Sequence, residues 1–200
     1  MKRIAWRKKQ QRWLILIALL AVVMIVFDRC QSYREHSQDE NILAAARKYG
    51  MDPSLVKAVV WRESRFNPHV RGKVGEIGLM QVGAAAANEW ARSEGISYFE
   101  QTELFDPAKN TMAGTWYLRK ALRRYGNTDL PAAYALAEYN GGRNNVLRWV
   151  KGPALTNSAV FFKQMDFPRT RDYVKAILKR QPRYQKEFES KEKIETAKGR

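Results

Sequence analysis

Cysteine and histidine are scarce in this sequence, which has one cysteine and two histidines among its 200 residues. A single cysteine excludes a disulfide within the chain and any cysteine-based zinc site. With two histidines, a histidine-rich metal centre is equally hard to build. We therefore expect no metal and no cofactor.

Strand signals are also missing, because no segment sustains a two-residue hydrophobic period, no hairpin turn stands out and no repeat occurs. The sequence instead contains residues that typically begin and end helices. Asp52-Pro53 and Asp106-Pro107 each pair an N-cap acceptor with a proline at the first helical position, and Gly50 occupies a helix-ending position. Thr170 is expected to cap a last helix that ends near Lys179, before Pro182. We predict a mainly α domain.

Acidic residues are few relative to basic ones, and the surplus is unevenly distributed. The chain has 36 Lys+Arg against 20 Asp+Glu, a net charge of +16. Residues 1–12 carry six of the basic side chains and no acid, and Trp13–Phe27 is an uncharged apolar run. A basic flank before an apolar run is typical of segments that enter the export machinery. The small residues of a cleavage site do not follow, so we predict an uncleaved anchor.

The predicted anchor divides the chain. Its fifteen residues would span about 22 Å, short of a hydrocarbon core of about 30 Å, so the flanking charged side chains would have to snorkel. We expect a cytoplasmic basic segment (1–12), a single-pass helix in the cytoplasmic membrane (13–27), a linker (28–40), an exported domain (41–184) and a charged flexible tail (185–200). A buried core helix is the alternative for 13–27, which the absence of a polar face disfavours.

The most informative position is a carboxylic acid on an apolar helix face. If a helix begins at Pro53, then Val56, Val59, Val60 and Glu63 share one face. Burial disfavours the ionised carboxylate and raises its pKa, and a glutamic acid that stays protonated near neutral pH can act as a general acid. Alternatively, Glu63 ends the helix facing solvent or pairs with an arginine.

A glycine-rich loop follows this helix. Gly72, Gly75 and Gly78 precede Leu79-Met80-Gln81. Such a density of glycine suits tight turns or close approach of a ligand to the backbone. Gln81 could then hydrogen-bond a sugar or a neighbouring carboxyl group, or lie at the surface.

These segments resemble the catalytic domain of the soluble lytic transglycosylases. The resemblance covers about residues 41–178, and its elements occur in the family's order: Glu63-Ser64, Phe66-Asn67-Pro68, Gly75, Gly78-Leu79-Met80-Gln81, Phe105-Asp106-Pro107 with Asn110 and Gly114, Ala137-Glu138-Tyr139-Asn140-Gly141-Gly142, and Thr170-Arg171-Asp172-Tyr173-Val174. No single piece is decisive, but this set in this order is highly specific.

The resemblance implies a lysozyme-like helical fold and cleavage of the β-1,4 bond between N-acetylmuramic acid and N-acetylglucosamine in peptidoglycan. Glu63 would protonate the leaving oxygen and then, as a carboxylate, accept the proton of the muramic acid 6-hydroxyl, which leaves a 1,6-anhydro end. The expected partners are glycan strands and the membrane, and we expect a monomer.

The resemblance also implies roles for other residues. Ser64 and Gln81 would contact substrate, and Gly78 and Met80 belong to the same substrate-binding set. Tyr139 and Asn140 would border the subsite at the cleaved bond, although they could merely end a helix. Tyr173 could orient Glu63 through a hydrogen bond, or be plain core. Asp106 and Asn110 are better explained as helix-capping and bracing residues.

The sequence departs from the family pattern at three places, which would alter the subsites and the charge of the cleft. Glu76 stands where a small residue is usual, Val82-Gly83-Ala84 replaces a leucine–methionine–proline run, and Glu138 replaces a small residue.

Other functions stay open to different degrees. A hydrolase on the same scaffold, similar to goose-type lysozyme, would use the same glutamate with water in place of the 6-hydroxyl. A non-catalytic wall-binding scaffold could keep the fold. Nucleic-acid binding is disfavoured, because the basic residues do not gather in a recognisable module and the domain is expected to be exported.

Overall fold

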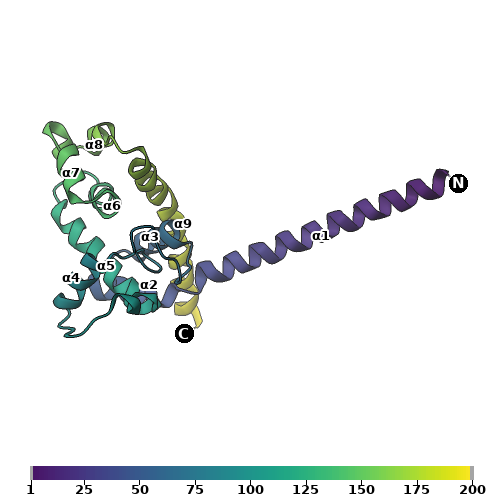
Figure 1. Cartoon of the computed structure of the whole chain (residues 1–200), viewed down its shortest axis with the longest axis horizontal. Coiled ribbons are helices and arrows are strands. Elements are labelled where there is room, and N and C mark those ends of the chain that lie inside the picture. The colour runs from purple at the N-terminus through teal and green to yellow at the C-terminus, as the bar shows by residue number, and fades with distance from the viewer. Residues whose placement is uncertain (1, 199–200) are drawn as a thin grey trace. The chain divides into compact units, whose positions relative to one another are not determined.

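The computed structural model describes the backbone of residues 2–198, which fall into two units, Met1–Ser37 and Gln38–Arg200. The first unit is one continuous helix, α1 (Lys2–His36) (Figure 1). The large apolar side chains of Trp13–Phe27 are 51–66% exposed, so the run is not a core helix of this chain. Among the described residues, this helix alone is long and apolar enough to cross a membrane, a test that a signal sequence also passes.

Residues 2–12 of the basic segment belong to the same helix, and the side chains up to residue 11 lie outside the described residues. The expected linker, 28–40, differs from the structure. Because residues 28–36 contain no glycine or proline, α1 continues to His36, and only a short turn separates it from the next helix.

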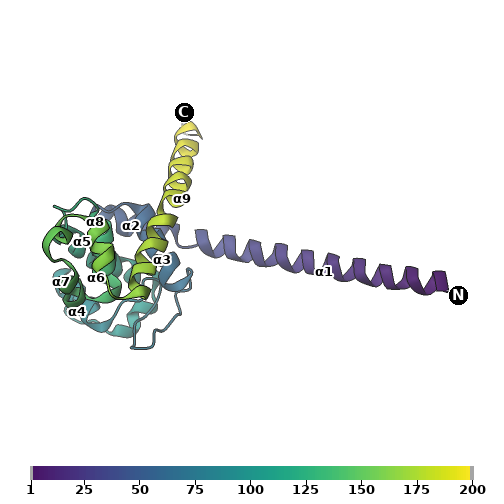
Figure 2. The same cartoon turned by 90° about the horizontal axis from the view of Figure 1, so that it is seen from above.

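The second unit is built from helices, and its longest connection is the loop 65–83 between the third and the fourth α-helix (Figures 1 and 2). No strand occurs among residues 2–198, where Arg71, Ile77 and Val82 form only isolated antiparallel bridges. This confirms the prediction of a mainly α domain. The α-helices are α2 (Asp39–Tyr49), α3 (Pro53–Ser64), α4 (Ala84–Ser93), α5 (Pro107–Arg124), α6 (Pro131–Gly141), α7 (Arg143–Trp149), α8 (Ser158–Gln164) and α9 (Pro168–Lys198), and the 3₁₀ helices are η1 (Gln101–Phe105) and η2 (Gly152–Leu155).

Local capping signals placed several helix ends correctly. The Asp52 carboxylate accepts a hydrogen bond from the Ser54 N–H at 2.8 Å, and the Asp106 carboxylate accepts one from the Lys109 N–H at 2.8 Å. Gly50 ends α2 with a left-handed φ of 61°. The cap predicted at Thr170 is wrong, because α9 already begins at Pro168 and the Thr170 hydroxyl lies 2.9 Å from Oδ1 of Asn140 in a hydrogen bond.

The last helix also differs from the prediction that it ends near Lys179. It runs through Pro182 to Lys198, although a proline inside a helix costs about 3 kcal/mol. Contacts on both sides of the proline offset this cost. Tyr184 is fully buried, its ring meets that of Phe66 edge-on at 6.4 Å, and Gln181 donates a hydrogen bond to the Asp52 carboxylate at 2.8 Å.

A buried lysine ties the end of α9 to α2 and α3. The Lys57 side chain is 0% exposed, and its Nζ lies 2.7 Å from the Asp39 carboxylate and 3.5 Å from that of Glu187. Lys191 donates to Asp39 from the same stretch of α9. Burial acts to raise the pKa of Asp39, but the bonds from the two lysines outweigh it and hold that pKa below its usual value. The residues predicted as a charged tail are therefore helical up to residue 198, and their contacts with α2 and α3 reach Lys191.

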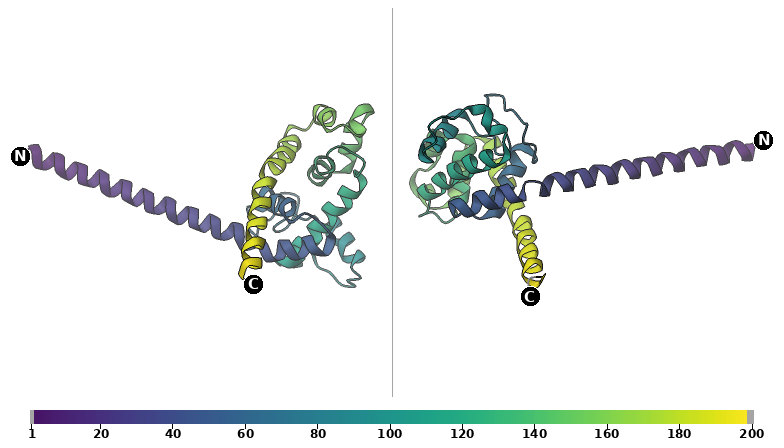
Figure 3. Two further views of the ribbon diagram at one scale, coloured as in Figure 1. Left: turned by 180° about the vertical axis from the view of Figure 1, so that it is seen from behind. Right: turned by 90° about the horizontal axis from the view of Figure 1, so that it is seen from below.

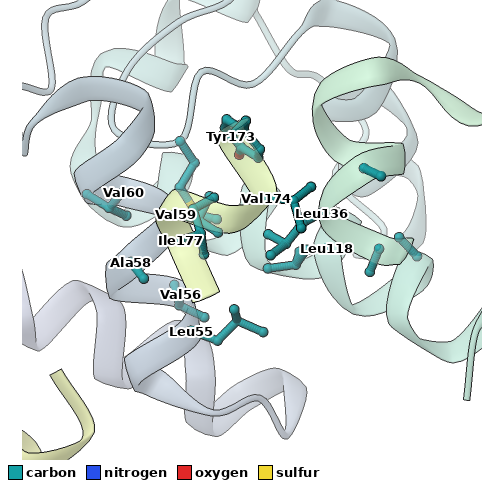
Figure 4. Packing of buried hydrophobic residues seen from close by; sticks show 14 of the residues in the cluster. Leu55, Val56, Ala58, Val59, Val60, Leu118, Leu136, Tyr173, Val174 and Ile177 are labelled. Carbon is teal, nitrogen blue, oxygen red and sulfur yellow. The ribbon is translucent and has the colours of Figure 1, made fainter. Parts of the chain in front are cut away.

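The core lies where α3 packs along α9, and the views from behind and below also show the two helices side by side (Figure 3). Val56, Val59 and Val60 of α3 are fully buried, as the helical spacing predicted. They share a cluster with Val174 and Ile177 of α9, next to side chains of α5 and α6 (Figure 4). This stripe runs along α3 and ends at its last turn, which carries Glu63.

Candidate active site

Glu63 is the next-to-last residue of α3, and the chain reverses directly after it. Arg65 and Phe66 have φ values of 53° and 63°, in the left-handed region that ends the helix. From the facing helix α9, the Tyr173 hydroxyl donates a hydrogen bond of 2.6 Å to Oε1 of Glu63. Tyr173 itself is 2% exposed, so it is both a core residue and a partner of this carboxyl group.

The surroundings of Glu63 raise the pKa of its carboxyl group into the neutral range. Burial raises the pKa of this carboxyl group to about 7, while the Tyr173 hydrogen bond and the nearby Arg62 cation act to lower it. The negative charge of Glu76 adds to the rise. A carboxylic acid with such a pKa can donate a proton and then take one back in the same pH range.

Glu63 opens into a cleft of about 400 Å³. Its walls come from the end of α3, the loop that follows it, and helices α4, α5 and α6. The lining residues are Glu63, Glu76, Gln81, Val82, Gly83, Ala85, Ala86, Tyr117, Tyr139 and Asn140.

The wall of the cleft opposite α3 depends on a buried asparagine. Oδ1 of Asn110 accepts from the Met80 N–H at 2.8 Å, and its Nδ2 donates to the carbonyls of Ile77 and Leu104 at 2.7 and 2.8 Å. At Gly78, where φ is 80°, a Cβ would collide with this amide. Gly78 therefore serves the close packing of the loop onto α5.

Tyr139 and Gln81 brace the same loop from two sides. The Tyr139 hydroxyl donates to the Met80 carbonyl at 2.8 Å. Nε2 of Gln81 donates to the carbonyls of Val70 and Gly78 at 3.1 and 3.0 Å, and the residue has a left-handed φ of 47°. Both side chains also line the cleft, so they combine a bracing contact with access to a ligand.

The residues that the resemblance assigned to the site do not all reach the cleft. Glu63, Gln81, Tyr139 and Asn140 line it, and Tyr173 contacts Glu63 from the core. Ser64, Gly78 and Met80 lie behind the wall. The Ser64 hydroxyl donates to the Val60 carbonyl at 3.2 Å. Direct contacts of these three residues with a substrate stay predictions.

Sequence reasoning missed Tyr117 of α5, which lines the cleft with its ring 5.8 Å from that of Tyr139. A signal for it existed. Gly114 lies against Met80, where a Cβ would collide with the Met80 side chain. Tyr117 follows Gly114 by three residues, so both occupy the same helix face.

Glu138, which the resemblance placed in the cleft region, acts on the cleft from behind its wall, since burial and the charge of Glu138 raise the pKa of the lining residue Tyr117. The Glu138 side chain is 1% exposed, forms an ion pair with Arg124 and accepts a 2.6 Å hydrogen bond from the Tyr125 hydroxyl. It is not among the residues that line the cleft. A helix face decides this, because Glu138 and its neighbour Tyr139 point in different directions from α6.

The described residues contain no group of three or more His, Cys, Asp or Glu side chains that could hold a metal ion. The polar side chains that line the cleft are two carboxyl groups, two tyrosine hydroxyls and the amides of Gln81 and Asn140.

Fold and site together define a lysozyme-like helical domain with one buried, proton-holding glutamic acid at the cleft. The family model of the transglycosylase SLT domain matches residues 40–161, more than half of the chain. The chain belongs to this family, as the resemblance of its motifs implied.

Solved structures agree with this assignment. The chain is similar to an inactive mutant of the lytic transglycosylase Slt from Pseudomonas aeruginosa, with 27% identity, a TM-score of 0.67 and coverage of 75% of this chain and 24% of that one. It is also similar to the 70 kDa soluble lytic transglycosylase of Escherichia coli, with 28% identity, a TM-score of 0.67 and coverage of 74% and 24%. A complex of the 70 kDa soluble lytic transglycosylase with bulgecin A matches equally well. The chain thus spans about a quarter of the length of these neighbours.

Proposed function

We propose that this protein is a lytic transglycosylase that cleaves the β-1,4 bond between N-acetylmuramic acid and N-acetylglucosamine in peptidoglycan. The observation that carries the proposal is Glu63, an acid with a pKa raised to about 7 that lines the cleft of an SLT domain. The names of the solved neighbours support the same activity.

In the proposed reaction, protonated Glu63 donates its proton to the glycosidic oxygen as the bond from that oxygen to C1 of the muramic acid breaks. The resulting Glu63 carboxylate then accepts the proton of the 6-hydroxyl of the same muramic acid, while the oxygen of that hydroxyl forms a bond to C1. The product is a 1,6-anhydro end, and Glu63 returns to its protonated state. The Tyr173 hydroxyl supports the carboxylate between the two steps, because it donates a hydrogen bond to Oε1.

Product analysis tests this proposal. We expect purified peptidoglycan incubated with the protein to release fragments whose muramic acid ends are lighter by one water than reducing ends, as detected by mass spectrometry. Reducing ends without anhydro products would contradict the transglycosylase proposal and favour a muramidase. No released fragments at all would favour a wall-binding scaffold.

One observation favours hydrolysis as a second candidate. Glu76 brings a second carboxyl group into the cleft, and hydrolytic glycosidases usually use two. The same product analysis decides between the two reactions, since only hydrolysis adds water to the new end.

We also propose that α1 anchors the protein in the cytoplasmic membrane with the second unit on the outer side. Support comes from the exposed apolar run Trp13–Phe27 and the basic residues that precede it. The full-length protein should stay in the membrane fraction through alkaline carbonate extraction and enter solution only with detergent. A chain recovered in the carbonate supernatant, with residues 1–27 removed by mass, would show that the segment is a cleaved signal.

A further inference from the structure

Glu76 is a carboxylate for which the proposed acid–base chemistry has no use. It lines the same cleft as Glu63, it comes from a different segment, and its charge is close enough to raise the pKa of Glu63. Keeping two carboxyl groups in one cleft costs electrostatic energy when both are ionised. A surface position would avoid this cost, but the loop holds Glu76 in the cleft.

The loop is shaped around this side chain. Oε2 of Glu76 accepts a hydrogen bond from the Val74 N–H at 3.2 Å, and the Gly72 N–H donates to the Glu76 carbonyl at 2.7 Å. The Glu76 carboxylate lies against Gly72, where a Cβ would collide with it and displace it from this position. Gly75, with a φ of 95°, turns the chain directly before Glu76, and its carbonyl accepts from Gln101 at 2.8 Å. Three hydrogen bonds therefore hold the loop that presents Glu76.

We propose that Glu76 is a second catalytic carboxylate, which stabilises the positive charge that develops on the sugar ring as the glycosidic bond breaks. The inference rests on the proposed function. Glycosidic cleavage passes through a transition state with oxocarbenium character, and a fixed negative charge beside it lowers the barrier more in a partly dry cleft than in water. Glu63 and Glu76 would thus divide the work, one as the protonated acid and the other as the ionised stabiliser.

Several titratable and charged groups around Glu63 set its pKa together with Glu76. Tyr173 of α9 donates to Glu63, Tyr139 of α6 lies near enough for Glu63 to raise its pKa, Arg62 is on the same helix, and Glu76 faces it from the loop. Of these, Glu76 acts to raise the pKa of Glu63, whereas Tyr173 and Arg62 act to lower it. Removing the charge of Glu76 and removing the Tyr173 hydroxyl should therefore shift the titration of Glu63 in opposite directions.

The test compares full-length Glu76→Gln, Glu76→Asp and Tyr173→Phe with the parent on soluble glycan fragments. Glu76→Gln keeps the shape of the side chain and loses its charge. We expect kcat to fall at least about tenfold with a smaller change in KM, because the lost interaction forms in the transition state. The alkaline limb of the pH–rate profile, where Glu63 ionises, should move to lower pH in Glu76→Gln and to higher pH in Tyr173→Phe.

Glu76→Asp serves as the matched variant, because it keeps the charge on a shorter side chain. We expect it to retain more of kcat than Glu76→Gln. Equal losses in the two variants, or a Glu76→Gln variant with kcat within about twofold of the parent and an unshifted alkaline limb, would overturn the proposal. So would a parent that forms reducing ends which disappear in Glu76→Gln, since Glu76 would then position a water molecule. Anhydro products from the parent, with no effect at Glu76, would leave the proposed function standing and remove only this inference.

Discussion

Glu63→Gln should abolish turnover while making the folded domain more stable at alkaline pH. The substitution keeps the shape of the side chain and removes the transferable proton, and general acid–base catalysis typically contributes about 10²–10⁴-fold to the rate. We expect release of anhydromuropeptides to fall by about 10³-fold or more. Mass spectrometry of digested peptidoglycan measures the loss.

The gain in stability follows from the sign of the pKa shift. The pKa of Glu63 rises from an ordinary 4.5 to about 7 in the folded protein, so the folded state holds this proton more tightly than the unfolded chain does. The resulting stabilisation is complete below pH 4.5 and is lost as the pH rises through 7. A glutamine does not ionise. The free energy of unfolding of Glu63→Gln should therefore exceed that of the parent by about 2–3 kcal/mol at pH 8 and equal it near pH 4.

Urea unfolding at the two pH values measures this difference. Glu40→Gln, the same change at an exposed position of α2, is the matched control and should alter neither activity nor the pH dependence of stability. A Glu63→Gln variant that lyses peptidoglycan as fast as the parent would refute the assignment of Glu63. An equal stability of variant and parent at both pH values would show that Glu63 is not held protonated by burial.

Arg124→Met should cause a large loss of stability for a substitution of a side chain that reaches solvent. Arg124 is partly exposed, but its partner Glu138 is 1% exposed, and the substitution leaves that carboxylate with only the Tyr125 hydroxyl beside it. Breaking a buried ion pair from one side typically costs about 3–5 kcal/mol. Because Arg124 can reach solvent, we expect about 3 kcal/mol, a large share of the stability of about 5–15 kcal/mol typical of a domain.

Urea unfolding at neutral pH compares Arg124→Met with the neighbouring Arg123→Met, whose side chain is exposed and which should change stability by less than about 0.5 kcal/mol. The double variant Arg124→Met/Glu138→Gln removes the stranded charge and keeps an oxygen for Tyr125, so it should recover most of the loss. If the double variant is as unstable as Arg124→Met, the loss of stability comes from the lost packing of the Arg124 side chain and not from the unpaired charge of Glu138. Since Glu138 adjoins Tyr139 in α6, the single variant should also lower activity.

Short-range signals carried most of the successful predictions. The caps at Asp52 and Asp106 depend on hydrogen bonds to N–H groups two or three residues away, and the apolar stripe of α3 depends on spacing within one helix. Glu63 could be singled out in the same way, because its position on that stripe is a property of the sequence. What the stripe could not show is the Tyr173 hydroxyl, which comes from 110 residues further along the chain.

The predictions that were wrong concern features that depend on residues far away in the sequence. Pro182 and the charged residues after it have the composition of a helix end and a tail, and locally they would form one. They continue α9 because Lys57, buried in α3, places its charge among Asp39, Glu187 and the ring of Tyr184. The ion pair of Glu138 with Arg124 of α5 was missed for the same reason, since it joins two helices.

The sequence by itself therefore determined the helical class, the apolar N-terminal segment, the acid that the proposed reaction needs and the family to which the chain belongs. The tertiary structure decided the pKa of Glu63, the presence of Tyr117 in its cleft, and the length of α9. The physical reason is that burial and charge act through space. A residue's helix and face follow from its neighbours in the chain, whereas its pKa and its partners follow from whatever the fold brings against it.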